Sequence, residues 1–355
     1  MPRRFSSLSD FYDTPYDTVI DVRSPAEYAE DHVPGAVSLP VLSNEERARV
    51  GTIYTQDSPF KARKIGAALV ARNAAAHIEG PLAGFDGGWQ PLVYCWRGGQ
   101  RSASFAAILA QIGWRAETVE GGYRSYRRLV VTAMHETALP HPVVMLDGNT
   151  GTAKTELLGL LAVRGVQTVD LEGLAAHRGS LFGGLAGGQP SQKAFEGALA
   201  RAFAGLDPAR PVVLEAESSK VGDLLVPPAV WAAMREAPRI RISAPLPARA
   251  RYLAAAYADV TADPVLLRDR LAQLTPYHGR AQVALWQAQA AAGEHVALAG
   301  ELMAAHYDPR YAKARARPEI RYLADVAVAD LAKPDLERAA DRVVSVLSGV
   351  FAAMA

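Results

Sequence analysis

Short apolar segments that alternate with helix-forming segments are the feature that most restricts how this chain can fold. Segments of four to eight apolar residues bounded by turn residues predict buried strands. In the first part of the chain these are residues 19–22, 36–39 and 91–94, and the helix-forming segments are residues 24–28, 102–112 and 123–137. Strands that alternate with helices in this way predict a parallel sheet.

A second alternation begins after Pro140 and Pro142. Its predicted strands are residues 143–147, 166–171, 211–215 and 239–243, with a helix at residues 154–162. From about Pro247 the chain is expected to be mostly helical to its end. We therefore predict a first domain at residues 1–126, a linker helix with a proline-containing connection at residues 127–141, and a second domain at residues 142–355.

Composition narrows the class of protein. The 355 residues include 38 basic and 37 acidic side chains, so the formal net charge is +1 and a uniformly basic protein is excluded, although a local basic face is not. Hydrophobic residues make up 50% of the chain, which indicates a folded protein. The chain starts without an apolar leader, lacks a stretch of about 18 apolar residues and has one cysteine, so we expect a cytoplasmic protein.

The single cysteine lies between an apolar strand and a helix, in the run Tyr94-Cys95-Trp96-Arg97-Gly98-Gly99-Gln100-Arg101-Ser102. A turn of small residues points successive N–H groups inward, and a helix that begins directly after it adds its dipole, so this turn can bind an anion. Arg101 can close such a pocket with its planar donors. This field favours the thiolate of Cys95, which can attack a phosphoryl or sulfane centre and hold the product covalently.

A second glycine-rich turn is close to the phosphate-binding pattern G-x-x-x-x-G-K-[ST], and it reads Gly148-Asn149-Thr150-Gly151-Thr152-Ala153-Lys154-Thr155. It follows a strand and begins a helix, which is the context that the pattern requires. Lys154 would contact the oxygens of a di- or triphosphate, and Thr155 could hold Mg²⁺. Ala153 departs from the pattern, which has glycine there, so a triphosphate such as ATP and a diphosphate both stay open as ligands.

Four carboxylates follow predicted strands of the second domain, namely Asp170, Glu172, Glu215 and Glu217. Carboxylates at strand ends beside a phosphate-binding loop are candidates for positioning a metal ion or a water molecule. Capping of the helices that follow is an equal alternative.

The first domain resembles the rhodanese domain. The motifs that carry the resemblance are Asp21-Val22-Arg23, Glu27-Tyr28, His32-Val33-Pro34-Gly35-Ala36 and the Cys95 loop. In that family the cysteine carries a persulfide or a selenium equivalent. The spacing of Cys95 and Arg101 also resembles the phosphatase branch of the same fold, so the loop alone leaves sulfur and phosphate chemistry open.

The whole chain resembles the tRNA 2-selenouridine synthase family, in which a rhodanese-like domain is fused to a P-loop domain. Further motifs in the same order along the chain are residues 170–175, 177–180, 189–193, 195–196, 215–218, 277–280 and 306–309. The resemblance implies an α/β fold, with an N-terminal rhodanese-like parallel-sheet domain followed by a P-loop NTPase-like α/β domain that has a helical C-terminal part.

The resemblance also implies a reaction. Family enzymes replace the sulfur of 2-thiouridine at the wobble position of tRNA with selenium from selenophosphate, and they are associated with a geranylated intermediate made with geranyl diphosphate. Cys95 would be the covalent selenium or sulfur carrier, and the rest of the loop (Trp96, Arg97, Gly98, Gly99, Gln100 and Arg101) would hold selenophosphate. Residues 148–155 would hold the diphosphate of the geranyl donor. No tightly bound cofactor is implied.

A tRNA partner requires a basic surface. The candidates are Arg178, Arg310, Tyr311, Lys313, Arg315 and Arg317, among which the aromatic ring could stack on a base. Helix faces with solvated ion pairs are the alternative. An enzyme that supplies selenophosphate is a further candidate partner, and the sequence predicts no oligomeric state.

Two other functions stay open from the residues alone. A thiolate-dependent phosphatase or sulfurtransferase of the rhodanese fold would use the Cys95 loop without any need for Lys154. A nucleotide-binding regulatory module would bind ATP through Lys154 and would not turn over tRNA.

Overall fold

The structure is a computed structural model that describes residues 2–216, 218–315 and 320–352. Its contacts divide the chain into two compact units. Unit 1 comprises Met1–Thr137 and Pro190–Gly205, and unit 2 comprises Ala138–Gln189 and Leu206–Ala355. The two predicted domains, which a linker at residues 127–141 separates, are each continuous in sequence. Unit 1 instead also includes a segment from the second half of the chain.

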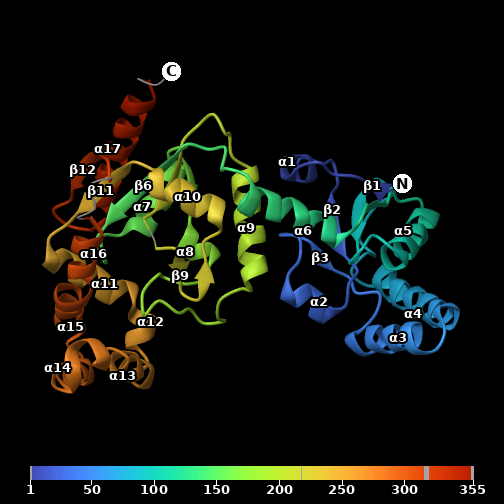
Figure 1. Cartoon of the computed structure of the whole chain (residues 1–355), viewed down its shortest axis with the longest axis horizontal. Coiled ribbons are helices and arrows are strands. Elements are labelled where there is room, and N and C mark those ends of the chain that lie inside the picture. Colours follow the sequence, from blue (N-terminus) through green and yellow to red (C-terminus); the bar gives the residue numbers. More distant parts are fainter. Residues whose placement is uncertain (1, 217, 316–319, 353–355) are drawn as a thin grey trace. The chain divides into compact units, whose positions relative to one another are not determined.

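Unit 1 is built on a parallel five-stranded sheet in the order β1-β5-β4-β2-β3. Its strands are β1 (Pro2–Arg3), β2 (Thr18–Asp21), β3 (Val37–Ser38), β4 (Pro91–Tyr94) and β5 (Glu117–Val119) (Figure 1). Its helices are α1 (Leu8–Tyr12), α2 (Pro25–Glu30), α3 (Asn44–Gln56), α4 (Pro59–Glu79), α5 (Gln100–Ile112), α6 (Tyr123–Val131), the π-helical turn η1 (Thr132–Glu136) and α9 (Gln192–Ala204). The predicted parallel sheet is confirmed.

The position of Cys95 follows from the strand order. The chain leaves β2 toward β3 and leaves β4 toward β5, so the connections after these two neighbouring strands run in opposite directions. Adjacent strands with this arrangement open a crevice at their carboxyl ends, where ligands bind in open α/β sheets. Cys95 directly follows β4 and Val22 directly follows β2, so both segments lie at this crevice.

Helix α9 is the segment of unit 1 that comes from the second half of the chain. Ser191 caps its N-terminus and donates its hydroxyl hydrogen to the carbonyl oxygen of Glu30 at 2.6 Å. Glu196, which is only 4% exposed, accepts hydrogen bonds from Arg127 and from Gln192. The apolar face of α9 buries Phe195, Leu199 and Phe203. Both apolar burial and ion pairing therefore hold α9 in unit 1.

Unit 2 is built on a second parallel five-stranded sheet, in the order β12-β11-β6-β8-β7. Its strands are β6 (Val143–Gly148), β7 (Gln167–Val169), β8 (Val212–Glu215), β11 (Arg239–Ser243) and β12 (Tyr322–Ala327), and β9 (Lys220–Val221) and β10 (Leu224–Leu225) form a separate antiparallel pair. Its helices are α7 (Lys154–Val163), α8 (Leu171–Leu174), α10 (Pro228–Glu236), α11 (Leu246–Ala256), α12 (Ala258–Thr261), α13 (Pro264–Ala272), α14 (Thr275–Ala291), α15 (His295–Leu302), the π-helical turn η2 (Met303–Tyr307), α16 (Asp308–Arg315) and α17 (Lys333–Ala352).

The described part of the region from Pro247 to the end is mostly helical, as predicted, and contains one strand. Strand β12 interrupts this region and pairs in parallel with β11 at the edge of the sheet. Of its residues only Val326 is fully buried, so the apolar pattern that predicts a strand is weak there. Helices α11 to α15 gather in the orange part of the ribbon, around a core that includes Trp286 and Leu271 (Figure 1).

The phosphate-binding turn also lies at a crevice of its sheet. The connections after the neighbouring strands β6 and β8 run in opposite directions, toward β7 and toward β11. Residues 149–153 follow β6, and Glu215 is the last residue of β8. Among the described residues, no helix combines the length and the apolar character that crossing a membrane requires.

Candidate functional site

Cys95 is buried at the carboxyl end of β4, with 3% of its surface exposed. The hydroxyl of Ser102, in the first turns of α5, donates a hydrogen bond to Sγ at 3.2 Å. The same hydroxyl lies 3.2 Å from the carbonyl oxygen of Gly99, so Ser102 links Sγ to the start of α5. The free N–H groups at the start of α5 face the same turn.

Two glycines give the cysteine loop its shape. Gly98 has φ +64°, and a Cβ atom there would lie 2.7 Å from the carbonyl oxygen of Val119. Gly122 has φ +62°, and a Cβ atom there would collide with the carbonyl oxygen of Cys95. The N–H of Tyr123 donates to that oxygen at 2.8 Å. The backbone of the segment that leads into α6 thus packs against the cysteine loop and hydrogen-bonds to it.

A cavity of about 360 Å³ opens in front of Cys95. Its lining residues are Tyr54, Arg63, Cys95, Trp96, Arg97, Gly99, Gln100 and Arg101, none of which is acidic. The structure therefore brings together all the predicted loop residues except Gly98, which shapes the turn from behind. Arg63 comes from α4 and Tyr54 from α3, and neither residue belongs to a motif that could mark it in the sequence.

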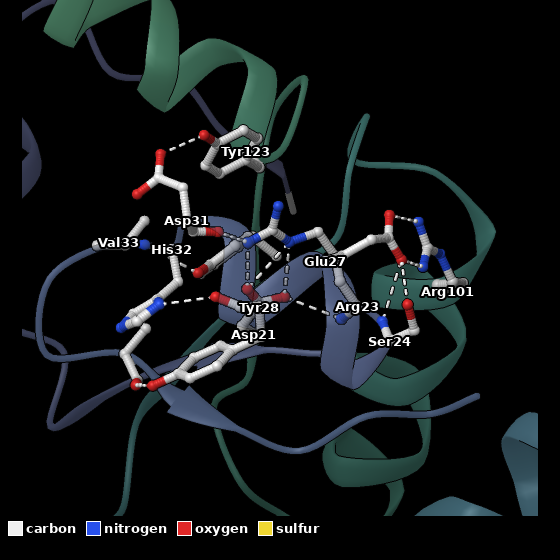
Figure 2. A network of polar contacts seen from close by, with 12 residues as sticks. Asp21, Arg23, Ser24, Glu27, Tyr28, Asp31, His32, Val33, Arg101 and Tyr123 are labelled. Atoms are coloured by element: carbon white, nitrogen blue, oxygen red, sulfur yellow. Dashed lines mark hydrogen bonds and ion pairs between the residues drawn. The ribbon is translucent and has the colours of Figure 1, made fainter. Parts of the chain in front are cut away.

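Arg101 is held by a carboxylate of the neighbouring segment. Its guanidinium donates to both oxygens of Glu27, at 2.7 and 3.2 Å, and Figure 2 shows this pair beside Ser24. Burial tends to raise the pKa of Glu27, but the hydrogen bonds and charge of Arg101 outweigh burial and lower it to about 2. Arg101 thus lines the cavity while Glu27 occupies two of its five N–H donors, and its role in closing the pocket around an anion stays a prediction.

The Asp21-Val22-Arg23 motif forms a buried frame next to the loop (Figure 2). Arg23 pairs with Asp21 at 2.6 Å and donates to the carbonyl oxygen of Asp31 at 2.6 Å. The guanidinium of Arg23 lies 4.1 Å from the ring centre of Tyr123. Trp96 stacks on the same tyrosine, with ring centres 5.3 Å apart. These residues position Trp96 and the loop rather than face the cavity.

The phosphate-binding turn follows β6 and leads into α7. The ammonium group of Lys154 donates to the carbonyl oxygen of Gly148 at 3.2 Å, and the hydroxyl of Thr155 donates to Glu172 at 3.4 Å. Ala153 has φ +57° and ψ +36°, a conformation that favours glycine, and its methyl group is buried in the core of unit 2. The departure from the motif therefore lies at a residue with a left-handed backbone, as is also true of Gly151 with φ +80°.

Two buried ion pairs support this turn. Arg249, 5% exposed, pairs with Asp308 at 2.7 Å, and Asn149 donates to the same carboxylate at 2.8 Å. Arg315 pairs with Asp147 at 3.0 Å. Burial tends to raise the pKa of Asp147, but the hydrogen bonds and charge of Arg315 outweigh burial and lower it. Arg249 carries no motif in the sequence, so its support of the turn is visible only in the structure.

The three described members of the predicted carboxylate set have different surroundings. Asp170 accepts a hydrogen bond from the N–H of Gly173 at 2.7 Å and so caps α8, which is the capping alternative. Glu172 contacts Thr155, and Glu215 is fully buried at the end of β8. Glu217 lies outside the described residues. Within the described ranges, no group of three or more His, Cys, Asp or Glu side chains could hold a metal ion.

The predicted RNA-binding residues have different surroundings. Arg178 makes two hydrogen bonds to Asp259, at 3.0 and 3.1 Å, and Arg315 is occupied by Asp147. Tyr311 lies between Lys154 and Arg315, with its ring centre 5.9 and 5.4 Å from their charged groups. Lys313 is exposed, and Arg317 lies outside the described residues. Of this set, Arg310 and Lys313 therefore offer the most exposed charge.

The motifs at residues 277–280 and 306–309, both in the helical region, contact each other. The Nε2 atom of His278 lies 2.9 Å from the Nδ1 atom of His306, and Arg310 donates to the other nitrogen of His306. Burial, followed by the charges of Arg310 and His278, lowers the pKa of His306 to about 4, so this ring is neutral at pH 7. The guanidinium of Arg310 also lies 4.9 Å from the ring centre of the exposed Tyr277.

A narrow apolar pocket of about 60 Å³ lies beside the phosphate-binding turn in unit 2. Thr150 of the turn forms part of its wall. The other lining residues are mainly apolar and come from α11, α12, α13, α15 and the residues around them: Ser180, Phe182, Leu253, Ala254, Tyr257, Val260, Thr261, Leu267, His295, Leu298, Ala299, Leu302 and Tyr307. A ligand with a polar head and an apolar tail matches such a pair of neighbouring sites.

Two protein families match consecutive parts of this chain. Residues 5–129 match the rhodanese-like domain, and residues 141–285 match the tRNA 2-selenouridine synthase AAA domain. A protein of Nitrosomonas europaea named tRNA 2-selenouridine synthase is 32% identical over 268 residues, which cover 74% of this chain and 68% of that protein. This chain belongs to the tRNA 2-selenouridine synthase family.

Two further relatives named tRNA 2-selenouridine synthase agree with this assignment. The protein of Alcanivorax borkumensis is 37% identical over 67% of this chain, and that of Bdellovibrio bacteriovorus is 34% identical over 65%. The match spans 64% and 62% of the length of these two proteins, which is less than two thirds.

Proposed function

We propose that this protein replaces the sulfur of 2-thiouridine at the wobble position of tRNA with selenium. Its relatives carry the name tRNA 2-selenouridine synthase. The observation that carries the proposal is the basic cavity around the buried Cys95, in a chain that also has a phosphate-binding turn next to an apolar pocket. The two sites suit two different phosphate-containing donors.

Selenophosphate suits the cavity around Cys95. The cavity has three arginines and no acidic residue in its lining, and the N–H groups at the start of α5 add further donors for an anion. Ser102 contacts Sγ at 3.2 Å and helps to hold the cysteine side chain in the loop. The sulfur that would act as the nucleophile therefore lies beside the site of the anion.

The oxidation level of selenium decides what Cys95 can carry. Selenium in selenophosphate is at the level of selenide, so a cysteine–selenium bond of the persulfide kind would need an oxidant. Attack of the Cys95 thiolate on phosphorus needs none, because an S–P bond forms, the P–Se bond breaks and selenium leaves as hydrogen selenide. Water then hydrolyses the S–P bond and releases phosphate. Cys95 stays the covalent site, with the phosphoryl group as its cargo.

Geranyl diphosphate suits the second site. Lys154 and the N–H groups of residues 148–155 would bind the diphosphate, and the apolar pocket that begins at Thr150 would take the prenyl chain once its side chains move apart. The hydroxyl of Thr155 and the carboxylate of Glu172 are oxygen donors of the type that Mg²⁺ prefers, so they would hold that ion with the diphosphate.

The two steps balance without a redox partner. In the first step the sulfur of 2-thiouridine attacks C1 of the geranyl donor, the C–O bond breaks and diphosphate leaves. In the second step selenide attacks C2 of the base, the C–S bond breaks and geranylthiol leaves. Alkylation of the sulfur makes it a better leaving group, which is the chemical reason for the first step. The exposed charges of Arg310 and Lys313 would contribute to tRNA binding.

Mass spectrometry of nucleosides from tRNA tests the proposal. The tRNA carries 2-thiouridine and is incubated with the protein, geranyl diphosphate and selenophosphate, with each donor omitted in turn. We expect S-geranyl-2-thiouridine when selenophosphate is omitted and 2-selenouridine only when both donors are present. Unchanged 2-thiouridine in every mixture contradicts the proposal. Vanadate-sensitive hydrolysis of an aryl phosphate that persists in Lys154→Ala would instead indicate the phosphatase.

A further inference from the structure

The wall of the Cys95 cavity opposite the cysteine loop comes from the hairpin of α3 and α4. This hairpin lies in the connection between β3 and β4, and it contributes Tyr54 and Arg63 to the cavity. Neither residue belongs to the loop that holds the reactive thiol. Tyr54 and Arg63 are therefore placed to contact a ligand that extends from the thiol beyond the small anion.

Tyr54 presents an unusually exposed ring to the cavity. Its side chain is 56% exposed, and among the described residues it makes no hydrogen bond or ring contact. Burial in the core does not explain an aromatic residue in this setting. An exposed ring at a ligand cavity is a stacking surface for a planar ring, because every nucleobase has a π-face.

Arg63 keeps its charge available. Two other basic residues of the hairpin form ion pairs, since Lys61 pairs with Asp57 at 2.7 Å and Arg47 lies 3.5 Å from Glu27. Arg63 forms no ion pair within the described part of the chain, and it is exposed at the cavity. A guanidinium without a carboxylate partner is suited to bind a phosphate oxygen.

The cavity has room for more than a tetrahedral anion. Its volume of about 360 Å³ lies in the range of sites for small organic molecules, which is about 300 to 1,000 Å³. The N–H groups of the cysteine loop and Arg97 occupy one side, and Tyr54 and Arg63 occupy the hairpin side. A nucleotide brought to the thiol would meet an aromatic ring and a free cation on that side.

We propose that the α3–α4 hairpin binds the acceptor nucleotide of the RNA at the Cys95 cavity, with Tyr54 stacked on a nucleobase and Arg63 bound to a backbone phosphate. This inference rests on the proposed function, because it assumes that the group released at Cys95 is transferred to RNA. Arg63 could also meet the phosphate of the small donor, since both ligands present the same oxygens. Separate titrations of RNA and donor distinguish these two sources.

The test uses the full-length protein and an anticodon stem–loop RNA with 2-thiouridine at the wobble position. The variants are Tyr54→Ala, Tyr54→Phe and Arg63→Gln, with Arg72→Gln as the matched control, because Arg72 is an exposed arginine of α4 outside the cavity lining. The KM for RNA and the KM for selenophosphate are measured separately, and RNA affinity is measured by fluorescence anisotropy.

Loss of the stacking ring in Tyr54→Ala should raise the KM for RNA about 5- to 150-fold, which corresponds to stacking on one base. Tyr54→Phe keeps the ring and should stay within about 3-fold of the wild type. Arg63→Gln should weaken RNA binding and lower the slope of log affinity against log salt by about one phosphate contact. Its effect on the KM for selenophosphate should be smaller, and Arg72→Gln should behave as the wild type.

Equal KM values for RNA in Tyr54→Ala and the wild type overturn the inference. So does an Arg63→Gln variant in which only the KM for selenophosphate rises, because the hairpin then serves the donor. A wild-type protein that modifies no nucleoside refutes the proposed function instead. In that case the RNA affinities of the same variants test whether the hairpin binds RNA. If all of them equal the wild-type affinity, the inference is overturned.

Discussion

The pair of Glu27 and Arg101 should contribute measurably to the stability of unit 1, and replacement of Glu27 by Gln tests this. The side chains are 12% and 21% exposed, so water screens their interaction only in part. A pKa lowered from 4.5 to about 2 corresponds to about 3 kcal/mol in favour of the charged carboxylate, at about 1.4 kcal/mol per pH unit. Because Gln still accepts one hydrogen bond, we expect Glu27→Gln to lower the free energy of unfolding by about 2 kcal/mol at pH 7.

The pH dependence gives this prediction its sign. A carboxyl group whose pKa is lower in the folded state binds its proton first in the unfolded state, so its contribution is complete above pH 4.5 and is lost as the pH falls toward 2. The difference between wild type and Glu27→Gln should therefore fall to less than half between about pH 7 and pH 3. Asp57→Asn is the control, because the exposed Asp57–Lys61 pair should be worth about 0.5 kcal/mol or less.

Hydrogen exchange is the appropriate assay, since the chain has two compact units and need not unfold in one step. Amides of β2 and β4, measured by mass spectrometry in increasing urea, report the opening of unit 1 alone. A Glu27→Gln difference below about 0.5 kcal/mol at pH 7, or one that does not change with pH, would refute the reasoning.

Three further substitutions test the turns at the two sites. Ala153→Gly should change the free energy of unfolding of unit 2 by less than about 1 kcal/mol, because relief of the left-handed conformation at φ +57° offsets a lost buried methyl group and added chain flexibility. Hydrogen exchange at β6 that shows a loss above about 2 kcal/mol would contradict this. Gly98→Ala places a Cβ atom 2.7 Å from the oxygen of Val119, so exchange at β4 should show a loss of about 2 kcal/mol or more, and wild-type stability would contradict the loop geometry. Asp308→Asn leaves the buried Arg249 without its carboxylate, so exchange at β6 should report a loss of about 2 to 3 kcal/mol, and no change would refute the support of the phosphate-binding turn.

Local sequence patterns were sufficient to predict the elements on which the sites stand. The strand predicted at residues 239–243 coincides with β11, and the helix predicted at residues 102–112 lies within α5, which Gly113 ends with φ +114°. Both features depend on neighbouring residues only, namely an apolar run and a glycine that adopts a left-handed conformation. The positions of the cysteine loop and the phosphate-binding turn at the carboxyl ends of strands could also be predicted, because each turn directly follows a local apolar run.

Contacts between distant segments could not be predicted in this way. Arg101 and Glu27 are 74 residues apart, and Arg249 and Asp308 are 59 residues apart, so no local pattern joins them. Strand β12 lacks a clear apolar pattern and owes its structure to pairing with β11. The packing of α9 in unit 1 likewise depends on residues such as Arg127 that are far from it in the sequence.

The central claim is that the two sites perform two separate steps, and nucleoside analysis with two variants tests it most directly. With both donors present, Cys95→Ala should accumulate S-geranyl-2-thiouridine and form no 2-selenouridine, whereas Lys154→Ala should leave 2-thiouridine unchanged. Formation of 2-selenouridine by Cys95→Ala would contradict the account.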